Sequence, residues 1–366
     1  MMKKRKRMTG NSGMTRREFI VTTGAATGAA MVTASIGPFV HTTMAKGKTL
    51  KICSYGGSYQ DSQRKALIQP FADKFGIKII EASGPDIAKV KAQVETKNYE
   101  WDVVDLETRH IARGELENLL EPIDTNVVDM SVLDKKAVRK CAAGNIFWTT
   151  SLAYNKKAIG GKKAAAGWAD FWDVKNFPGP RALQDQAPFN LEFALLADGV
   201  PMDKIYPIDV DRAFKKMDQI KKHITVWWKS GAQQIQLLTS AEAHYASAWN
   251  GRVNVAQKKG VPLEIVWEGG CIDLDWWCIP KGNPNKDLAM KFIDFALGAK
   301  RQAEQMEKYI AYGPTNLGAF KYISEERAKE LPSYPENLKK QFAHDADYWG
   351  PKLAPLTERW KTWMIS

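Results

Sequence analysis

Strand and helix signals alternate along the first part of this chain. Short apolar runs at 49–55, 77–82 and 101–106 predict strands. Two stretches with helical spacing of apolar residues separate these runs, and we expect Ser58 to cap the first helix and Asp86 the second. The order predicts an α/β protein whose parallel strands are joined by right-handed crossovers. In such sheets ligands bind beyond the carboxyl ends of the strands.

Two loops at predicted strand ends are therefore candidate ligand loops. The first lacks the GxGxxG pattern of dinucleotide sites, but it offers backbone amides at a helix start, which suit a carboxylate or a phosphate. Its residues are Tyr55, Gly56, Gly57, Ser58 and Tyr59. The residues of the second loop are Glu107, Thr108, Arg109 and His110.

The stretch 266–285, VWEGGCIDLDWWCIPKGNPN, carries two acids inside an apolar run. A Gly-Gly turn at 269–270 is predicted to lead into a strand that Pro280 and Gly282 end. Asp273 and Asp275 are two residues apart, so both side chains should leave the same face of that strand. Either this face is wet, or the pair lies in a cleft and meets a cation, because a desolvated carboxylate needs a partner.

The N-terminal segment is typical of an export signal. Residues 1–45 hold seven basic side chains and one acidic side chain, Glu18. This segment therefore carries +6, half of the net charge of +12. The letters TRREFI at 15–20 match a twin-arginine consensus, and a moderately apolar run and a small-x-small site at 43–45 follow. We expect cleavage and export of the folded protein to the periplasm. A transmembrane anchor is the alternative, but the run is short for a span of ~20 residues.

The rest of the chain is predicted to form two lobes, with the second inserted in the first. Its basic excess is spread thinly, so we do not expect nucleic-acid binding. Each lobe is expected to hold a mixed sheet flanked by helices, with a hinge between the lobes. The predicted parts are a signal peptide at 1–45, lobe 1 at 46–152 plus 276–320, and lobe 2 at 153–275 plus 321–366.

Cysteine and histidine patterns give no sign of a metal site or a cofactor. The four cysteines, Cys53, Cys141, Cys271 and Cys278, contain no CxxC pair, and buried free thiols are the simplest interpretation, with one disulfide left open. The five histidines show no metal spacing. Glu268 with the two aspartates of the same stretch could bind a hard cation, which remains a minor alternative.

Five motifs occur in an order and spacing that together resemble a known family. They are KICSYGGSYQ, NYEWDVVDLET, SAWNGRV, EGGCIDLDWWCIPKGNPN and YIAYGPTN. The chain after the signal resembles bacterial extracellular solute-binding proteins of ABC importers, in the branch of the spermidine and putrescine receptors. The resemblance implies a two-lobed periplasmic-binding-protein fold of type II (cluster II), which closes around a small solute and presents it to a membrane permease. It implies neither an enzyme nor a cofactor.

The resemblance also implies roles for two residues. Trp249 matches an aromatic residue that lies along the amine chain in polyamine receptors, and Asp275 matches an acid that binds an ammonium group. The physical logic agrees, because an ammonium group is stabilised by an indole face and by a carboxylate in a medium of low dielectric constant.

Other positions depart from the polyamine pattern. The departures are Asp273 in place of a second clamping Trp, Gln186 and Phe189 in place of an acid pair, and Arg109 in place of a tyrosine. Fewer acids and one added arginine suit a zwitterion, whose ammonium would meet Asp275 and whose carboxylate would lie near Arg109 and the amides of 56–58. Arg181 is a second candidate for that carboxylate, and a surface or interlobe salt bridge is the alternative for either arginine.

The predicted function is capture of a small organic amine by a monomeric periplasmic component of an ABC importer. The ligand is either a polyamine such as putrescine or spermidine, or an amino acid such as γ-aminobutyrate. A thiamine-like or metal-complex receptor of the same fold is an alternative, as is an exported hydrolase with Asp273 and Asp275 as acid and base. The candidate ligand-binding residues are Asp275, Trp249, Asp273, Arg109, Tyr55, Gly56, Gly57, Ser58, Glu107, Thr108, Trp148, Arg181 and Tyr312.

Overall fold

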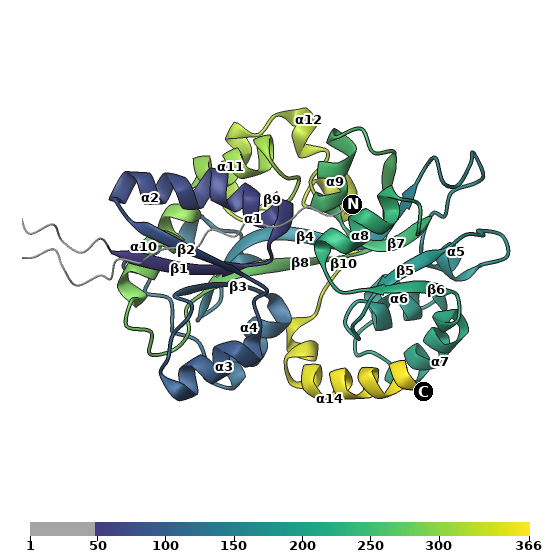
Figure 1. Cartoon of the computed structure of the whole chain (residues 1–366), viewed down its shortest axis with the longest axis horizontal. Coiled ribbons are helices and arrows are strands. Elements are labelled where there is room, and N and C mark those ends of the chain that lie inside the picture. The colour runs from purple at the N-terminus through teal and green to yellow at the C-terminus, as the bar shows by residue number, and fades with distance from the viewer. Residues whose placement is uncertain (1–47) are drawn as a thin grey trace, which may run out of the picture. The chain divides into compact units, whose positions relative to one another are not determined.

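Two long antiparallel strands run through the middle of a mixed sheet in the computed structural model, which describes residues 48–366 (Figure 1). They are β4 (Ala142–Asn155) and β8 (Leu263–Cys278). The two strands pair along almost their whole length, with register shifts near Gly144 and Thr150. The sheet order is β2-β1-β3-β8-β4-β7-β5-β6, while β9 (Gly313–Pro314) pairs with β4 and β10 (Gln341–Ala343) pairs with β8. The predicted signal segment lies outside the described residues.

The first half of the sheet shows the predicted alternation of strands and helices. Its parallel strands are β1 (Thr49–Ser54), β2 (Lys78–Ser83) and β3 (Val103–Glu107), and β3 lies antiparallel to β8. The helices on one face are α1 (Gly57–Gln63), which continues through a π-helical segment (Arg64–Ile68), and α2 (Gln69–Phe75). Those on the other face are α3 (Ile87–Thr96) and α4 (Thr108–Leu116). Each face has its own apolar core, because strand side chains alternate between the faces.

The two predicted helix caps differ in outcome. The carboxylate of Asp86 accepts a hydrogen bond from the amide of Ala88 at 2.7 Å and caps α3 as predicted. Ser58 does not cap α1: the helix begins at Gly57, and the N-cap position is Gly56, with φ 63° and no side-chain hydrogen bond. Two consecutive glycines with positive φ open this helix, so the chain can turn sharply out of β1.

The second half of the sheet contains β5 (Arg181–Gln184), β6 (Ile224–Trp228) and β7 (Tyr245–Trp249). β5 is parallel to both of its neighbours, and β7 is antiparallel to β4. The helices around it are α5 (Trp168–Trp172), α6 (Asn190–Ala197), α7 (Val210–Lys221), α8 (Gly231–Thr239) and α9 (Asn250–Lys258). Together these elements enclose one large apolar core that is rich in aromatic rings.

The C-terminal part of the chain returns to both halves of the sheet. Its helices are α10 (Lys286–Ala296), α11 (Ala299–Lys308), α12 (Glu325–Ala328), α13 (Pro335–Leu338) and α14 (Ala346–Ile365). α14 packs against α4 (Figure 1), and its tryptophans belong to the core of the second half. Short 3-10 segments lie at 130–132, 135–137, 202–204 and 317–322. The lobe boundaries stated above stay a prediction.

One expectation about the central stretch is wrong. Gly269 and Gly270 do not form a turn between two strands, because both lie within β8, which runs unbroken from Leu263 to Cys278. Gly269 has φ +70°, and its carbonyl accepts a hydrogen bond from the indole of Trp168 at 2.8 Å. The positive φ coincides with the register shift opposite Thr150, so the pair of glycines carries the strand through a bulge.

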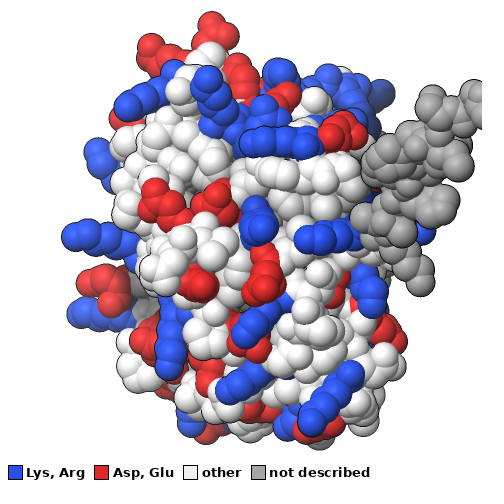
Figure 2. Space-filling model, turned by 90° about the vertical axis from the view of Figure 1, so that its left-hand side faces the viewer, with Lys and Arg blue, Asp and Glu red and all other residues white. Residues whose placement is uncertain are grey.

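Several properties of the described residues bear on the expectations above. All four cysteines are buried and unpaired. None of the helices within 48–366 has both the length and the apolar character that a membrane span requires. On the face drawn in Figure 2, acidic and basic side chains are interspersed.

Candidate ligand-binding site

Four carboxylates lie on two adjacent strands in the centre of the sheet. β3 supplies Asp105 and Glu107, and β8 supplies Asp273 and Asp275. Glu107 lies directly opposite Asp275 in the antiparallel register. All four side chains are buried. Because β-strand side chains alternate, residues two apart on each strand share a face, and the carboxylates form one acidic group.

A small pocket opens beside this group, where the carboxyl ends of β1, β3 and β7 approach the middle of β4 and β8. About 240 Å³ there is not filled by protein atoms, and part of this space is open to solvent. Its lining residues are Tyr55, Tyr59, Glu107, Trp148, Trp249, Arg252, Asp275 and Tyr312. Six of these residues were predicted as ligand-binding from the sequence, and the pocket lies at strand ends as the topology led us to expect.

Asp275 is the acid of the pocket lining that has no cationic partner among the described residues. Its Oδ1 is buried and has no hydrogen-bond partner among the described residues. Burial raises the pKa of Asp275 well above its ordinary value, and the nearby carboxylates of Asp105 and Glu107 raise it further. A cation placed against Asp275 would remove both penalties, because it would satisfy the oxygen and stabilise the charged form.

Asp105 lies deeper and has polar partners of its own. Its Oδ2 accepts hydrogen bonds from Gln63 Nε2 at 2.7 Å, Tyr59 Oη at 2.9 Å and Ser54 Oγ at 3.0 Å. Burial raises the pKa of Asp105 to about 7 despite these donors. Asn145 in turn donates to Tyr59 Oη at 2.9 Å. The arrangement fixes the ring of Tyr59, which forms one wall of the pocket.

Arg252 is the cation of the pocket. It lies in the first turn of α9, and its Nη2 donates to the carbonyls of Tyr55 and Gly56, both at 3.2 Å. Its guanidinium lies 5.2 Å from the ring centre of Trp249, and its Nε is buried without a partner among the described residues. A Cβ at Gly57 would lie 2.6 Å from Nη1, so the absence of a side chain there leaves room for the guanidinium.

Two indoles complete the wall next to Arg252. Trp148 and Trp249 meet edge to face with ring centres 6.0 Å apart, and Trp228 supports Trp249 from behind at 5.4 Å. The Nε1 atoms of Trp148 and Trp249 are both buried and lack partners within the described chain. Buried tryptophan N–H groups usually find an acceptor, so this end of the pocket offers donors to a bound group.

Glu107 lines the pocket, but its charge is already paired. Arg109 forms a buried ion pair with it, and Arg109 Nη2 donates to Gln186 Oε1 at 3.2 Å. The guanidinium also lies 5.3 Å from the ring centre of Phe189. Burial raises the pKa of Glu107, and the charge of Arg109 opposes that rise. The structure thus places Arg109 against an acid near the expected ammonium position, and Arg109 is not part of the pocket lining.

The remaining predicted residues lie elsewhere. Thr108 and Asp273 line a second, larger cavity together with His344, whose Nδ1 is 3.2 Å from Asp273 Oδ2. Gly57 and Ser58 border a third cavity that reaches Arg252. Arg181 is buried at the start of β5, opposite Tyr245 of β7. Tyr245 precedes Trp249 by four residues, so Arg181 is ~13 Å from Trp249 along the strand direction.

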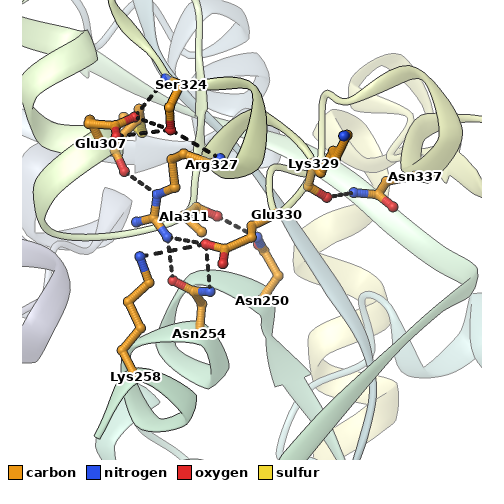
Figure 3. A network of polar contacts seen from close by, with 11 residues as sticks. Asn250, Asn254, Lys258, Glu307, Ala311, Ser324, Arg327, Lys329, Glu330 and Asn337 are labelled. Atoms are coloured by element: carbon orange, nitrogen blue, oxygen red, sulfur yellow. Dashed lines mark hydrogen bonds and ion pairs between the residues drawn. The ribbon is translucent and has the colours of Figure 1, made fainter.

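A polar network holds the helix that carries Arg252 (Figure 3). Asn250, at the start of α9, donates to the carbonyl of Ala311 at 2.7 Å, beside the pocket residue Tyr312. Further along the helix, the buried Arg327 of α12 donates to Asn254 at 2.8 Å and pairs with Glu330. These contacts fix α9 against the C-terminal part of the chain, and so they fix the position of its first turn.

Arg252 is the main residue that the sequence reasoning missed. Its signal was weak: Arg252 follows Trp249 by three residues in the SAWNGRV motif, where the strand that ends at Trp249 leads into the first turn of α9. The structure also bears on the alternative that Glu268, Asp273 and Asp275 bind a hard cation. Within residues 48–366, no group of three or more His, Cys, Asp or Glu side chains is arranged to hold a metal ion.

Residues 66–337 match the family described as bacterial extracellular solute-binding protein. The chain is 37% identical over 333 residues to the gamma-aminobutyric acid-binding protein of Pseudomonas aeruginosa, covering 89% of this chain and 93% of that protein. It is 26% identical to the spermidine/putrescine-binding periplasmic protein of Escherichia coli, covering 74% and 79%. The crystal structure of an ABC transporter substrate-binding protein from Bradyrhizobium japonicum has a TM-score of 0.81 and 40% identity, covering 87% of this chain and all of that one.

Proposed function

The chain belongs to the bacterial extracellular solute-binding protein family, and from this premise we propose that its pocket captures a short zwitterionic amino acid of the γ-aminobutyrate type. The observation that carries the proposal is a pair of opposite charges in one small pocket. Asp275 presents an oxygen without a partner, and Arg252 lines the same pocket as two indoles whose N–H groups have no partner among the described residues.

The ammonium of the ligand binds at Asp275. Because Asp275 Oδ1 has no protein donor among the described residues, an ammonium group gains a charge-assisted hydrogen bond there without displacing one. The indole and phenol rings that line the pocket add cation–π stabilisation in a desolvated setting. Because burial disfavours the ionised form of Asp275, an ammonium group that binds there stabilises the carboxylate and lowers its pKa.

The carboxylate of the ligand binds at Arg252 and the two indole N–H groups. A guanidinium donates through several N–H groups in a plane that fits a carboxylate. Arg252 Nε, Trp148 Nε1 and Trp249 Nε1 are all buried donors without partners in the described chain. This site replaces the one that the sequence reasoning gave to Arg109, which is paired with Glu107.

The charge balance favours a zwitterion over a polyamine. The pocket lining holds two acids and one arginine, and Glu107 is neutralised from behind by Arg109. One free negative and one free positive group remain, which match an amino acid. A diamine would place its second ammonium against Arg252 at a cost of several kcal/mol for like charges in such a site. The relative that is 37% identical is named as a gamma-aminobutyric acid-binding protein, in agreement with this balance.

We further propose that the protein acts in the periplasm as a monomer that delivers its unchanged ligand to the membrane permease of an ABC importer. The structural relative from Bradyrhizobium japonicum is an ABC transporter substrate-binding protein, which supports an importer as the partner. The twin-arginine motif at 15–20 supports export in the folded state. Binding requires no cofactor, because the protein side chains supply both charges that the ligand needs.

Isothermal titration calorimetry with 4-aminobutyrate tests the proposal. Truncating one member of a buried, hydrogen-bonded charge pair costs about 2–5 kcal/mol, so Asp275→Asn and Arg252→Gln should each weaken binding by roughly thirtyfold or more. Butylamine, which lacks the carboxylate, should bind weakly and should not distinguish Arg252→Gln from the native protein.

Arg212→Gln is the matched control. Arg212 pairs with Asp198 and its side chain is 45% exposed, so its loss should leave the affinity unchanged. The proposal fails if the native protein does not bind 4-aminobutyrate, or if both pocket variants bind it as tightly as the control does.

A further inference from the structure

The four carboxylates of β3 and β8 differ in how they are compensated. Asp105 has only neutral donors: a glutamine, a tyrosine, a serine and an asparagine. Asp273 lies next to the imidazole of His344. Glu107 has the guanidinium of Arg109, and Asp275 has no cationic partner among the described residues. Of the two acids that line the pocket, Glu107 and Asp275, only Asp275 is without a cationic partner among the described residues.

Glu107 and Asp275 are near enough to serve the same ligand group. They are directly opposite in the antiparallel pair of β3 and β8, so their Cβ atoms are about 4.5–5.5 Å apart. Both line the pocket. Without Arg109, an entering cation would meet two adjacent buried carboxylates, and the field along the pocket would favour ligands with a larger positive charge.

Arg109 is held in place by contacts to residues that do not line the pocket. Its side chain is buried, it donates to Gln186 at 3.2 Å, and it lies over the ring of Phe189. It does not line the pocket, so it compensates Glu107 from behind without occupying ligand space. A guanidinium suits this position because it stays charged when buried and forms several hydrogen bonds in one plane.

We propose that Arg109 is a specificity-determining residue, a built-in counter-ion that occupies the place of a second ligand cation beside Glu107. The pocket then selects a solute with one ammonium group and no net charge. The inference rests on the proposed function, since it names the residue that makes the same pocket choose the amino acid over the diamine. Arg109 acts through Glu107 and does not touch the ligand.

Variants of the pair provide the test, with 4-aminobutyrate and putrescine as the two probes. The measured quantity is the ratio of their dissociation constants, from calorimetry and competition at a mildly alkaline pH. Arg109→Gln leaves Glu107 uncompensated and should shift the ratio toward putrescine by about thirtyfold, the effect of a unit charge roughly 8 Å away at an effective dielectric constant near 20. Glu107→Gln leaves Arg109 uncompensated and should shift the ratio away from putrescine.

The double variant Glu107→Gln/Arg109→Gln restores the charge balance, so its ratio should return toward that of the native protein even if both affinities fall. Arg109→Lys keeps the charge and should keep the native preference. Opposite shifts in the two single variants separate a charge effect from a structural one, because loosening the pocket would move both in the same direction.

Shifts of the same sign, or no shift in either single variant, would overturn the inference. Glu107→Gln tests it even if Arg109→Gln does not fold, because the charge of Arg109 remains in that variant. Failure of the proposed function is distinct, since there the native protein would not bind 4-aminobutyrate at all.

Discussion

Replacement of Gly231 by alanine tests whether the position of Arg252 controls binding. Gly231 is the first residue of α8, and its backbone does not have a positive φ, so alanine fits there without backbone strain. The added Cβ would overlap the guanidinium of Arg252 and would lie 2.5 Å from Cζ3 of Trp249. The neighbours must move. Trp249 has little room to do so, since it is packed between Trp148 and Trp228, and a shift of Arg252 would weaken its hydrogen bonds to Tyr55 and Gly56.

Two opposite effects set the magnitude. Overpacking a tightly packed site typically costs 1–3 kcal/mol, and here the cost falls on the two side chains that are proposed to hold the ligand carboxylate. Alanine also has a higher helix propensity than glycine by up to about 1 kcal/mol, which supports the fold. We therefore expect the dissociation constant for 4-aminobutyrate to rise roughly fivefold to a hundredfold, while the free energy of unfolding changes little.

Calorimetry and urea unfolding measure these two quantities. Gly167→Ala is the matched control, because a Cβ there would meet nothing within 4 Å and the backbone again lacks a positive φ. An affinity for Gly231→Ala within twofold of the control would refute the reasoning. It would mean that Arg252 can move without loss of binding, and that the ligand carboxylate is held elsewhere.

Two further predictions concern groups outside the ligand contacts. Burial raises the pKa of Asp105 from 3.8 to about 7, so between these values the folded protein keeps a proton that the unfolded chain has lost. The Asp105 carboxyl group therefore lowers the free energy of unfolding as the pH rises through this window, by up to about 1.4 kcal/mol per pH unit. Urea unfolding of Asp105→Asn should show a flatter pH dependence than the native protein. An unchanged slope would contradict this. Arg181→Met should bind 4-aminobutyrate within about twofold of the native protein in calorimetry, because residues more than ~10 Å apart act independently, and a large loss of affinity would return Arg181 to the site.

Much of the fold could be predicted because its signals are local. The alternating apolar runs of the first half became β1, β2 and β3, and Asp86 caps α3 as its position before an apolar stripe indicated. The location of the pocket followed from topology, because Glu107 and Trp249 end strands whose carboxyl ends meet it. The continuity of β8 through Gly269 was missed because the bulge depends on its pairing with β4, which lies over a hundred positions earlier in the chain.

The positions of the two arginines could not be read from the sequence, because each depends on distant partners. That Arg109 meets the ligand carboxylate was an expectation from the sequence; in the structure it pairs with Glu107 and contacts Gln186 and Phe189, which lie beyond β4. Arg252 reaches the pocket because Gly57 and Gly231 leave space for its guanidinium. No local sequence pattern predicts that these two glycines, which lie on different helices, both contact Arg252.

In the proposed complex, a bound zwitterion would join elements from both halves of the sheet. Asp275 lies in β8 opposite Glu107 of β3, in the first half. Arg252 lies on a helix of the second half and donates hydrogen bonds to the carbonyls of Tyr55 and Gly56 in the first half. A ligand held at both charges adds a second connection of this kind, and its length must fit the gap between them. A chain that is too short would satisfy one charge and leave the other buried without a partner, which costs more than the single contact returns. Ligand length should therefore be selected as strictly as ligand charge, and glycine should bind far more weakly than 4-aminobutyrate although it carries the same two groups.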